Sequence, residues 1–258
     1  MIKGAKAQSR AKQDFLASLE TAGRIYGPAR ELCKYDYETF EGTMYQPNVA
    51  AKVVGLAFLS AVSAWEDFVS NIYLGYLSGY PAPNGYTPEL RVGKAANKSH
   101  ALLLAAGESN LREAERRMKW GSLRWVRSLS KVHFKAGNPF QAITDSDVEW
   151  IDLAVIIRNR VAHNSDKSKK LFKEAFNKLV GEHKDTPLPT GFSPGWLLTA
   201  FLESYPKLRT LYSDEHYWGD LFEGYISLWC RIAEHLCPGE TVAVNHRLHP
   251  IAERTRSG

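Results

Sequence analysis

Residues 49–73 constrain the fold most, because they form a helix pattern that is apolar on nearly every side. Apolar residues recur at steps of three and four, and many of them are small. Pro47 and Asn48 stand where a helix begins, and several prolines and glycines follow Gly79 within ten residues. A helix of this kind is buried on more than one side. The pattern therefore predicts a long core helix packed among other helices.

Helical periodicity or helix-end residues mark the remaining elements, and no long alternating run argues for a sheet. The predicted fold class is all-α, with residues 1–240 as a single domain and 241–258 as a basic irregular tail. The only short strand candidate is 241–244. The other predicted helices are 10–32, 111–134 with a potential break at Gly121-Ser122, a segment from the capping residues 144–147 past Ile157, 169–180, 195–211 and 218–236.

The composition is that of an ordinary folded protein, and its positive net charge favours anionic partners. Hydrophobic residues make up 44% of the chain and charged residues 24%, and the net charge is +5. Neither an apolar signal sequence nor eighteen consecutive apolar residues occur, so we expect no membrane span. The three cysteines form no C-x-x-C pair. We expect reduced thiols and a cytoplasmic protein.

The most informative segment is 156–164, where an apolar helix pattern gives way to two arginines, two amides and a histidine. An imidazole can transfer protons near neutral pH, and a guanidinium can hold two phosphate oxygens at once. Together these groups suit cleavage of a phosphodiester. The spacing of arginine and histidine alone is weak evidence, because chance produces it readily in a chain of this composition.

The segment resembles the signature R-N-x-x-x-H of the HEPN domains, a family of all-α ribonucleases. It reads Arg158-Asn159-Arg160-Val161-Ala162-His163. Family members also tend to have an acidic residue on an earlier apolar helix, where this chain offers Glu66, with Asp67 as the second choice. The resemblance covers about residues 49–178. It implies a HEPN-like helical bundle with additional C-terminal helices.

The resemblance also implies an activity: a metal-independent endoribonuclease without cofactors, in which a homodimer forms one composite site. The ribose 2′-hydroxyl would attack its own phosphate, with His163 as general acid and base and Arg158 stabilising the charged oxygens. Asn159 would orient the phosphate or the imidazole, and Glu66 would hold Arg158 or His163. Many members act as toxins or in defence against phage, so an antitoxin or a sensor protein is a further expected partner.

Basic residues supply a separate indication of an RNA path. Lysines and arginines are dense in 112–135, and some recur every seven residues if that helix is continuous, with Trp120 as a stacking platform. The alternative for these residues is a solvated helix face with core aromatics. The alternative function is a non-catalytic helical module that binds RNA or a protein partner through the basic face of 112–135, with a structural motif. The predicted RNA-binding residues are Arg117, Arg124, Lys131, Arg160 and Lys167.

Overall fold

The computed structural model describes residues 3–33, 46–183, 185–200 and 219–239. Within these ranges the regular elements are helices, and an isolated β-bridge joins Leu90 to Phe134. The all-α prediction is confirmed. The helices are α1 (Lys3–Cys33), α2 (Pro47–Leu77), α3 (Lys98–Ala106), α4 (Leu111–Arg117), α5 (Leu123–His133), α6 (Asp145–Ala162), α7 (Asp166–Val180), α8 (Pro194–Leu198) and α9 (Leu221–Leu236).

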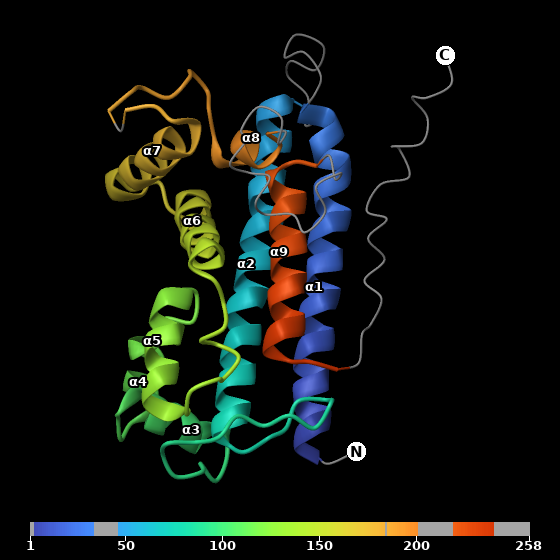
Figure 1. The fold of residues 1–258 in the computed structure, drawn as a ribbon. Helices are drawn as coiled ribbons and strands as arrows, with labels where there is room; N and C mark the ends of the chain where they lie inside the picture. The colour runs from blue at the N-terminus through green and yellow to red at the C-terminus, as the bar shows by residue number, and fades with distance from the viewer. Residues whose placement is uncertain (1–2, 34–45, 184, 201–218, 240–258) are drawn as a thin grey trace.

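Three long helices, α1, α2 and α9, run side by side and form the core (Figure 1). Phe15 of α1 stacks on Phe68 of α2 with ring centroids 4.7 Å apart. Phe58 of α2 packs against aromatic rings of α9, including Tyr225 and Trp229. The predicted core helix is therefore confirmed. The remaining helices lie along the other side of α2, with α6 and α7 near one end and α3, α4 and α5 near the other (Figure 1).

Helix α2 is also long and apolar enough to cross a membrane by length and composition. Half of its most apolar window is buried inside the fold. The core helix of a soluble protein has the same properties, so this is weak evidence for a membrane span.

Buried polar contacts fasten α9 to the rest of the bundle. The Lys12 ammonium is almost fully buried, donates to the carbonyls of Cys237 and Gly239 at 3.1 Å, and lies 2.8 Å from a Glu234 carboxylate oxygen. A cation at this position complements the carbonyl end of a helix. At the N-terminal side of α6, Asp147 accepts hydrogen bonds from both Arg231 Nη atoms of α9.

Several predicted boundaries differ from the structure. Helix α1 already begins at Lys3, and α3 was not predicted although Asn97 caps its first turn and Gly107 ends it with φ of 65°. Helix α8 ends at Leu198, whereas the predicted helix 195–211 extends into residues outside the described ranges. The start of the predicted helix 218–236, the strand candidate 241–244 and the tail 241–258 also lie outside them.

The predicted helix 111–134 is two helices, α4 and α5, rather than one. The turn between them allows Trp120 to pack against Tyr73 of α2, with ring centroids 5.5 Å apart. Ser122 then caps α5 by accepting a hydrogen bond from the Trp125 backbone N–H. The seven-residue repeat of basic residues therefore does not continue along one helix.

Candidate functional site

The end of α6 carries the predicted motif. Thr144 caps the helix, and Ile151, Ala154 and Ile157 are buried against the core. This apolar face fixes the helix against α2. The helix ends at Ala162, and His163 has an extended backbone with φ of −133° while its N–H still donates to the Asn159 carbonyl.

Arg158 lies at the contact between α6 and α2. Its Nη2 atom donates to Glu66 Oε2 at 2.9 Å, and its Nη1 atom donates to Asn159 Oδ1 at 2.9 Å. The Arg158 and Glu66 side chains are 25% and 26% exposed, so the pair is only partly screened by water. Arg158 therefore contacts two of the other three predicted catalytic residues, Glu66 and Asn159, within one chain. Asp67, the second choice, is exposed on the outer side of α2.

Glu66 lies in a partly desolvated position. Burial raises the pKa of its carboxyl, the Arg158 charge lowers it and the Asp67 charge raises it, with a net rise. The loop between α4 and α5 also covers this carboxylate, because a Cβ atom added to Gly121 would lie 2.4 Å from Glu66 Oε1. Gly121 therefore permits a close approach of backbone and carboxylate that a larger residue would prevent.

His163 stands apart from the other three residues. Its side chain is exposed, and within the described residues no hydrogen bond or ion pair of its imidazole is present. Its carbonyl accepts hydrogen bonds from Ser168 Oγ at 2.7 Å and Arg160 Nη1 at 3.5 Å. His163 lies beyond the end of α6 with an extended backbone, and among the described residues the Arg158 guanidinium bonds to Glu66 and Asn159 rather than to its imidazole. A single chain does not join them into one site.

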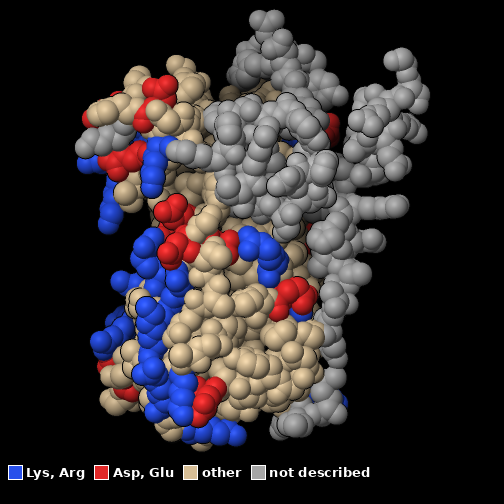
Figure 2. All heavy atoms as spheres, in the orientation of Figure 1, with Lys and Arg blue, Asp and Glu red and all other residues tan. Residues whose placement is uncertain are grey.

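The predicted RNA-binding residues are exposed to different degrees. Lysines and arginines gather over α4 and α5 (Figure 2). Arg117 is paired with Glu108 at 2.7 Å, and Arg124 with Asp152 at 3.1 Å. Lys131 and Lys167 are exposed and have no ion pair among the described residues, whereas Arg160 donates to Asn164 Oδ1 at 3.2 Å.

These contacts correct the predicted path in two respects. Several of its cations are already paired with carboxylates of the same chain, so its field is weaker than the sequence indicates. Exposed pairs of this kind contribute only about 0.2–1 kcal/mol, so phosphate could replace the carboxylates. Trp120, predicted as a stacking platform, is partly buried against Tyr73 and Trp125 and belongs to the core.

Sequence reasoning did not single out Gly121 as a contact of Glu66 or notice two further carboxylates on α6, Glu149 and Asp152. Both carboxylates line a cleft between α6 and α7. Their spacing was an available signal, because residues 149, 152 and 156 share one face of an ideal helix. The contact of Gly121 had no such signal, since it joins distant segments.

Comparisons with protein-family models, with curated proteins and with solved structures found no match. The resemblance to HEPN domains therefore rests on the motif and on Glu66. The three cysteines are buried free thiols. Among the described residues, no group of three or more His, Cys, Asp and Glu side chains is placed to hold a metal ion.

Proposed function

We propose that this protein is a metal-independent endoribonuclease that acts as a homodimer. The observation that carries the proposal is the arrangement at the end of α6. Arg158 is held by Glu66 and Asn159, and an exposed His163 follows directly after the end of the helix. A fixed guanidinium and an accessible imidazole are the two groups that cleavage of RNA by its own 2′-hydroxyl requires.

In this scheme each residue has one task. His163 accepts the proton of the ribose 2′-hydroxyl and returns a proton to the departing 5′-oxygen. Arg158 stabilises the negative charge that develops on the phosphate oxygens. Glu66 and Asn159 keep the guanidinium in place. The products are a 2′,3′-cyclic phosphate and a 5′-hydroxyl. A second copy of the chain contributes its own motif, so that the two motifs form one composite site.

We place the dimer contact at an exposed apolar residue next to the segment of α2 that packs on the end of α6. Val161 of α6 packs against Gly55 of α2, where an added Cβ would lie 3.2 Å from Val161 Cγ2. The neighbouring Leu56 is 58% exposed, which leaves apolar area at the same end of α6. A second copy that covers Leu56 would bring the two motifs near each other. The same proposal includes a biological role for the ribonuclease as a toxin or in defence against phage. An antitoxin or a sensor protein would then be a further partner.

The test is cleavage of labelled single-stranded RNA and tRNA in excess EDTA. We expect His163→Ala to abolish cleavage, because no other described group near it replaces the imidazole. The matched control is His235→Ala, an exposed histidine on α9. Arg158→Lys should reduce kcat by about a hundredfold or more, as loss of one charge-stabilising donor does. Equal cleavage by wild type and His163→Ala would refute the assignment.

Dimerisation has a separate test by sedimentation. Leu56→Glu should convert the dimer to a monomer and abolish cleavage, because it places a charge in the proposed interface. Leu111→Glu is the matched control, since Leu111 is 44% exposed at the start of α4. A wild-type protein that sediments as a monomer and still cleaves RNA would contradict the composite site.

The second candidate is a non-catalytic helical module that binds RNA or a protein through the basic surface of α4 and α5. The observation that favours it is the Arg158–Glu66 pair itself, because a half-buried pair between two helices is also a structural contact. In this case RNA binds without cleavage, and His163→Ala changes nothing. A filter-binding assay run beside the cleavage assay separates the two functions.

A further inference from the structure

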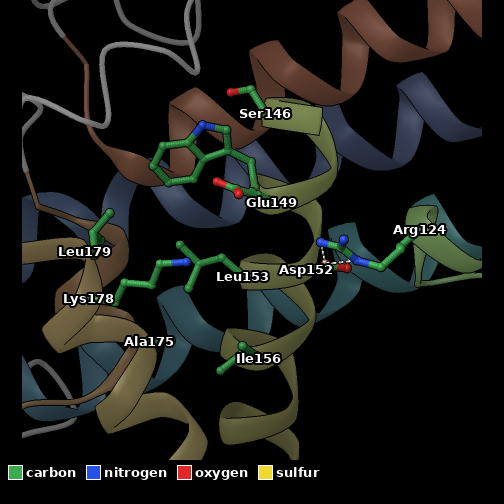
Figure 3. Close-up of a pocket in the computed structure, with 10 residues that line it drawn as sticks. Arg124, Ser146, Glu149, Asp152, Leu153, Ile156, Ala175, Lys178 and Leu179 are labelled. Carbon is green, nitrogen blue, oxygen red and sulfur yellow. Dashed lines mark hydrogen bonds and ion pairs between the residues drawn. The ribbon is translucent and has the colours of Figure 1, made fainter. Parts of the chain in front are cut away.

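A cleft of about 480 Å³ lies between α6 and α7 (Figure 3). Its volume falls within the range of small-molecule sites. Leu153 and Ile156 of α6 and Leu179 of α7 form apolar walls, and Trp150 adds part of an aromatic ring. The cleft is therefore suited to a flat apolar group.

The rim of the cleft offers hydrogen-bond acceptors. Asp152 Oδ2 accepts from Arg124 Nε at 3.3 Å and from Nη2 at 3.1 Å, and within the described residues no hydrogen bond reaches its Oδ1 atom. Glu149 is exposed, and its carboxylate has no ion pair in the described part of the chain. The lining also holds the cations Arg124, which is paired with Asp152, and Lys178, so the cleft carries no net positive charge that would draw the RNA backbone into it.

The cleft is also close to the motif along the helix. Ile156 lies six residues before Ala162, the last residue of α6, which is about 9 Å of helix axis at 1.5 Å per residue, and His163 follows directly. Neighbouring nucleotides of one strand can therefore occupy both places. Arg160, which lies between them on the same helix, and Lys167 supply positive charge on the motif side for the connecting phosphates.

We propose that the cleft between α6 and α7 binds a nucleobase of the RNA strand whose phosphate lies at His163, with a preference for bases that carry an amino group. The inference rests on the proposed function. Apolar walls contact the faces of the base, and Glu149 and Asp152 accept hydrogen bonds from the amino group of cytosine, adenine or guanine. Uracil has no amino group and binds less tightly.

Binding of nucleosides tests the cleft without catalysis. Cytidine and uridine lack phosphate, so each probes the base site alone. We expect cytidine, and not uridine, to shift the NMR methyl resonances of Leu153 and Ile156. Glu149→Gln should weaken cytidine binding, because an amide offers one acceptor fewer. The cleft-filling variant Ile156→Trp should abolish it, and Val132→Trp on α5, at a residue that is 60% exposed, is the matched control.

Cleavage of RNA supplies the second measurement. Ile156→Trp should raise KM about tenfold and remove the preference for sites next to cytidine or adenosine, because one base contact is lost. If wild type cuts no RNA yet binds cytidine, the nuclease fails and the cleft proposal holds. If wild type cuts RNA and Ile156→Trp changes neither KM nor base preference, the cleft proposal is wrong and the nuclease holds. If neither cytidine nor uridine binds, the cleft proposal is wrong. The apolar walls would then accommodate a protein side chain instead.

Discussion

Gly121 is the residue through which the loop between α4 and α5 reaches the motif. A Cβ atom at this position would lie 2.4 Å from Glu66 Oε1, and its φ is not positive, so alanine strains the side-chain contact rather than the backbone. Gly121→Ala should therefore fold while it moves the Glu66 carboxylate away from Arg158. We expect the free energy of unfolding, measured with urea, to fall by about 1 kcal/mol, as for one lost hydrogen bond.

The control for Gly121→Ala is the same change in the Glu66→Ala background. There the carboxylate is gone, so the added methyl group meets no obstacle and the substitution should cost nothing. A double-mutant cycle isolates this coupling. An equal loss of stability in both backgrounds would show that the contact with Glu66 is irrelevant.

The site residues differ in how far local sequence could predict them. Arg158, Asn159 and His163 follow one another within six positions, so one segment reveals them. Glu66 required the resemblance to a family, because it lies 92 residues away from Arg158. Gly121 contacts Glu66 only through the packing of the α4–α5 loop on α2. No local pattern encodes such a contact.

The ends of the helices also differ in how far the local sequence could predict them. The start of α6 after Thr144 and the start of α2 at Pro47 were predictable from capping residues and proline. Gly121-Ser122 marked a potential break between α4 and α5, but the end of α4 at Arg117 was harder to predict, because Met118, Lys119 and Trp120 contain no strong helix breaker. The packing of Trp120 against Tyr73 determines that the chain leaves the helix before this residue. Tertiary packing overrides helix propensity at this point.

The cap of α5 gives a prediction for this turn. Ser122 accepts a hydrogen bond from the Trp125 N–H at 3.4 Å, so Ser122→Ala should lower the free energy of unfolding by about 1 kcal/mol. Ser128→Ala is the matched control, because Ser128 is exposed within the same helix and donates only to the Arg124 carbonyl. Urea denaturation measures both. A similar effect of the two substitutions would contradict the cap.

The whole bundle is closed by buried polar contacts between the two ends of the chain. Lys12 reaches the Cys237 carbonyl, and Arg30 reaches Asp220 at 2.8 Å and Glu223 at 3.3 Å. Charged residues are rarely buried without such partners. The helical pattern predicted that these segments form helices but not that they meet, because each contact spans 190 residues or more.

The Asp220 carboxyl makes the stability of the bundle depend on pH. Burial and the neighbouring Glu223 raise its pKa to about 7, against the opposing charge of Arg30. The folded state therefore holds a proton more tightly than the unfolded chain, whose carboxyl has a pKa near 3.8. The resulting stability is fully present below the unfolded value and is lost as pH rises through about 7.

Asp220→Asn should remove this dependence while it preserves the start of α9, because asparagine also caps helices well. From about pH 5 to about pH 8, the urea midpoint of wild type should fall more than that of the variant. Asp67→Asn, at an exposed residue on α2, should keep the wild-type profile. Parallel curves for wild type and Asp220→Asn would mean that the buried carboxyl is ionised throughout this range. The contact with Arg30 would then be a permanent ion pair, and the bundle would owe its pH dependence to other groups.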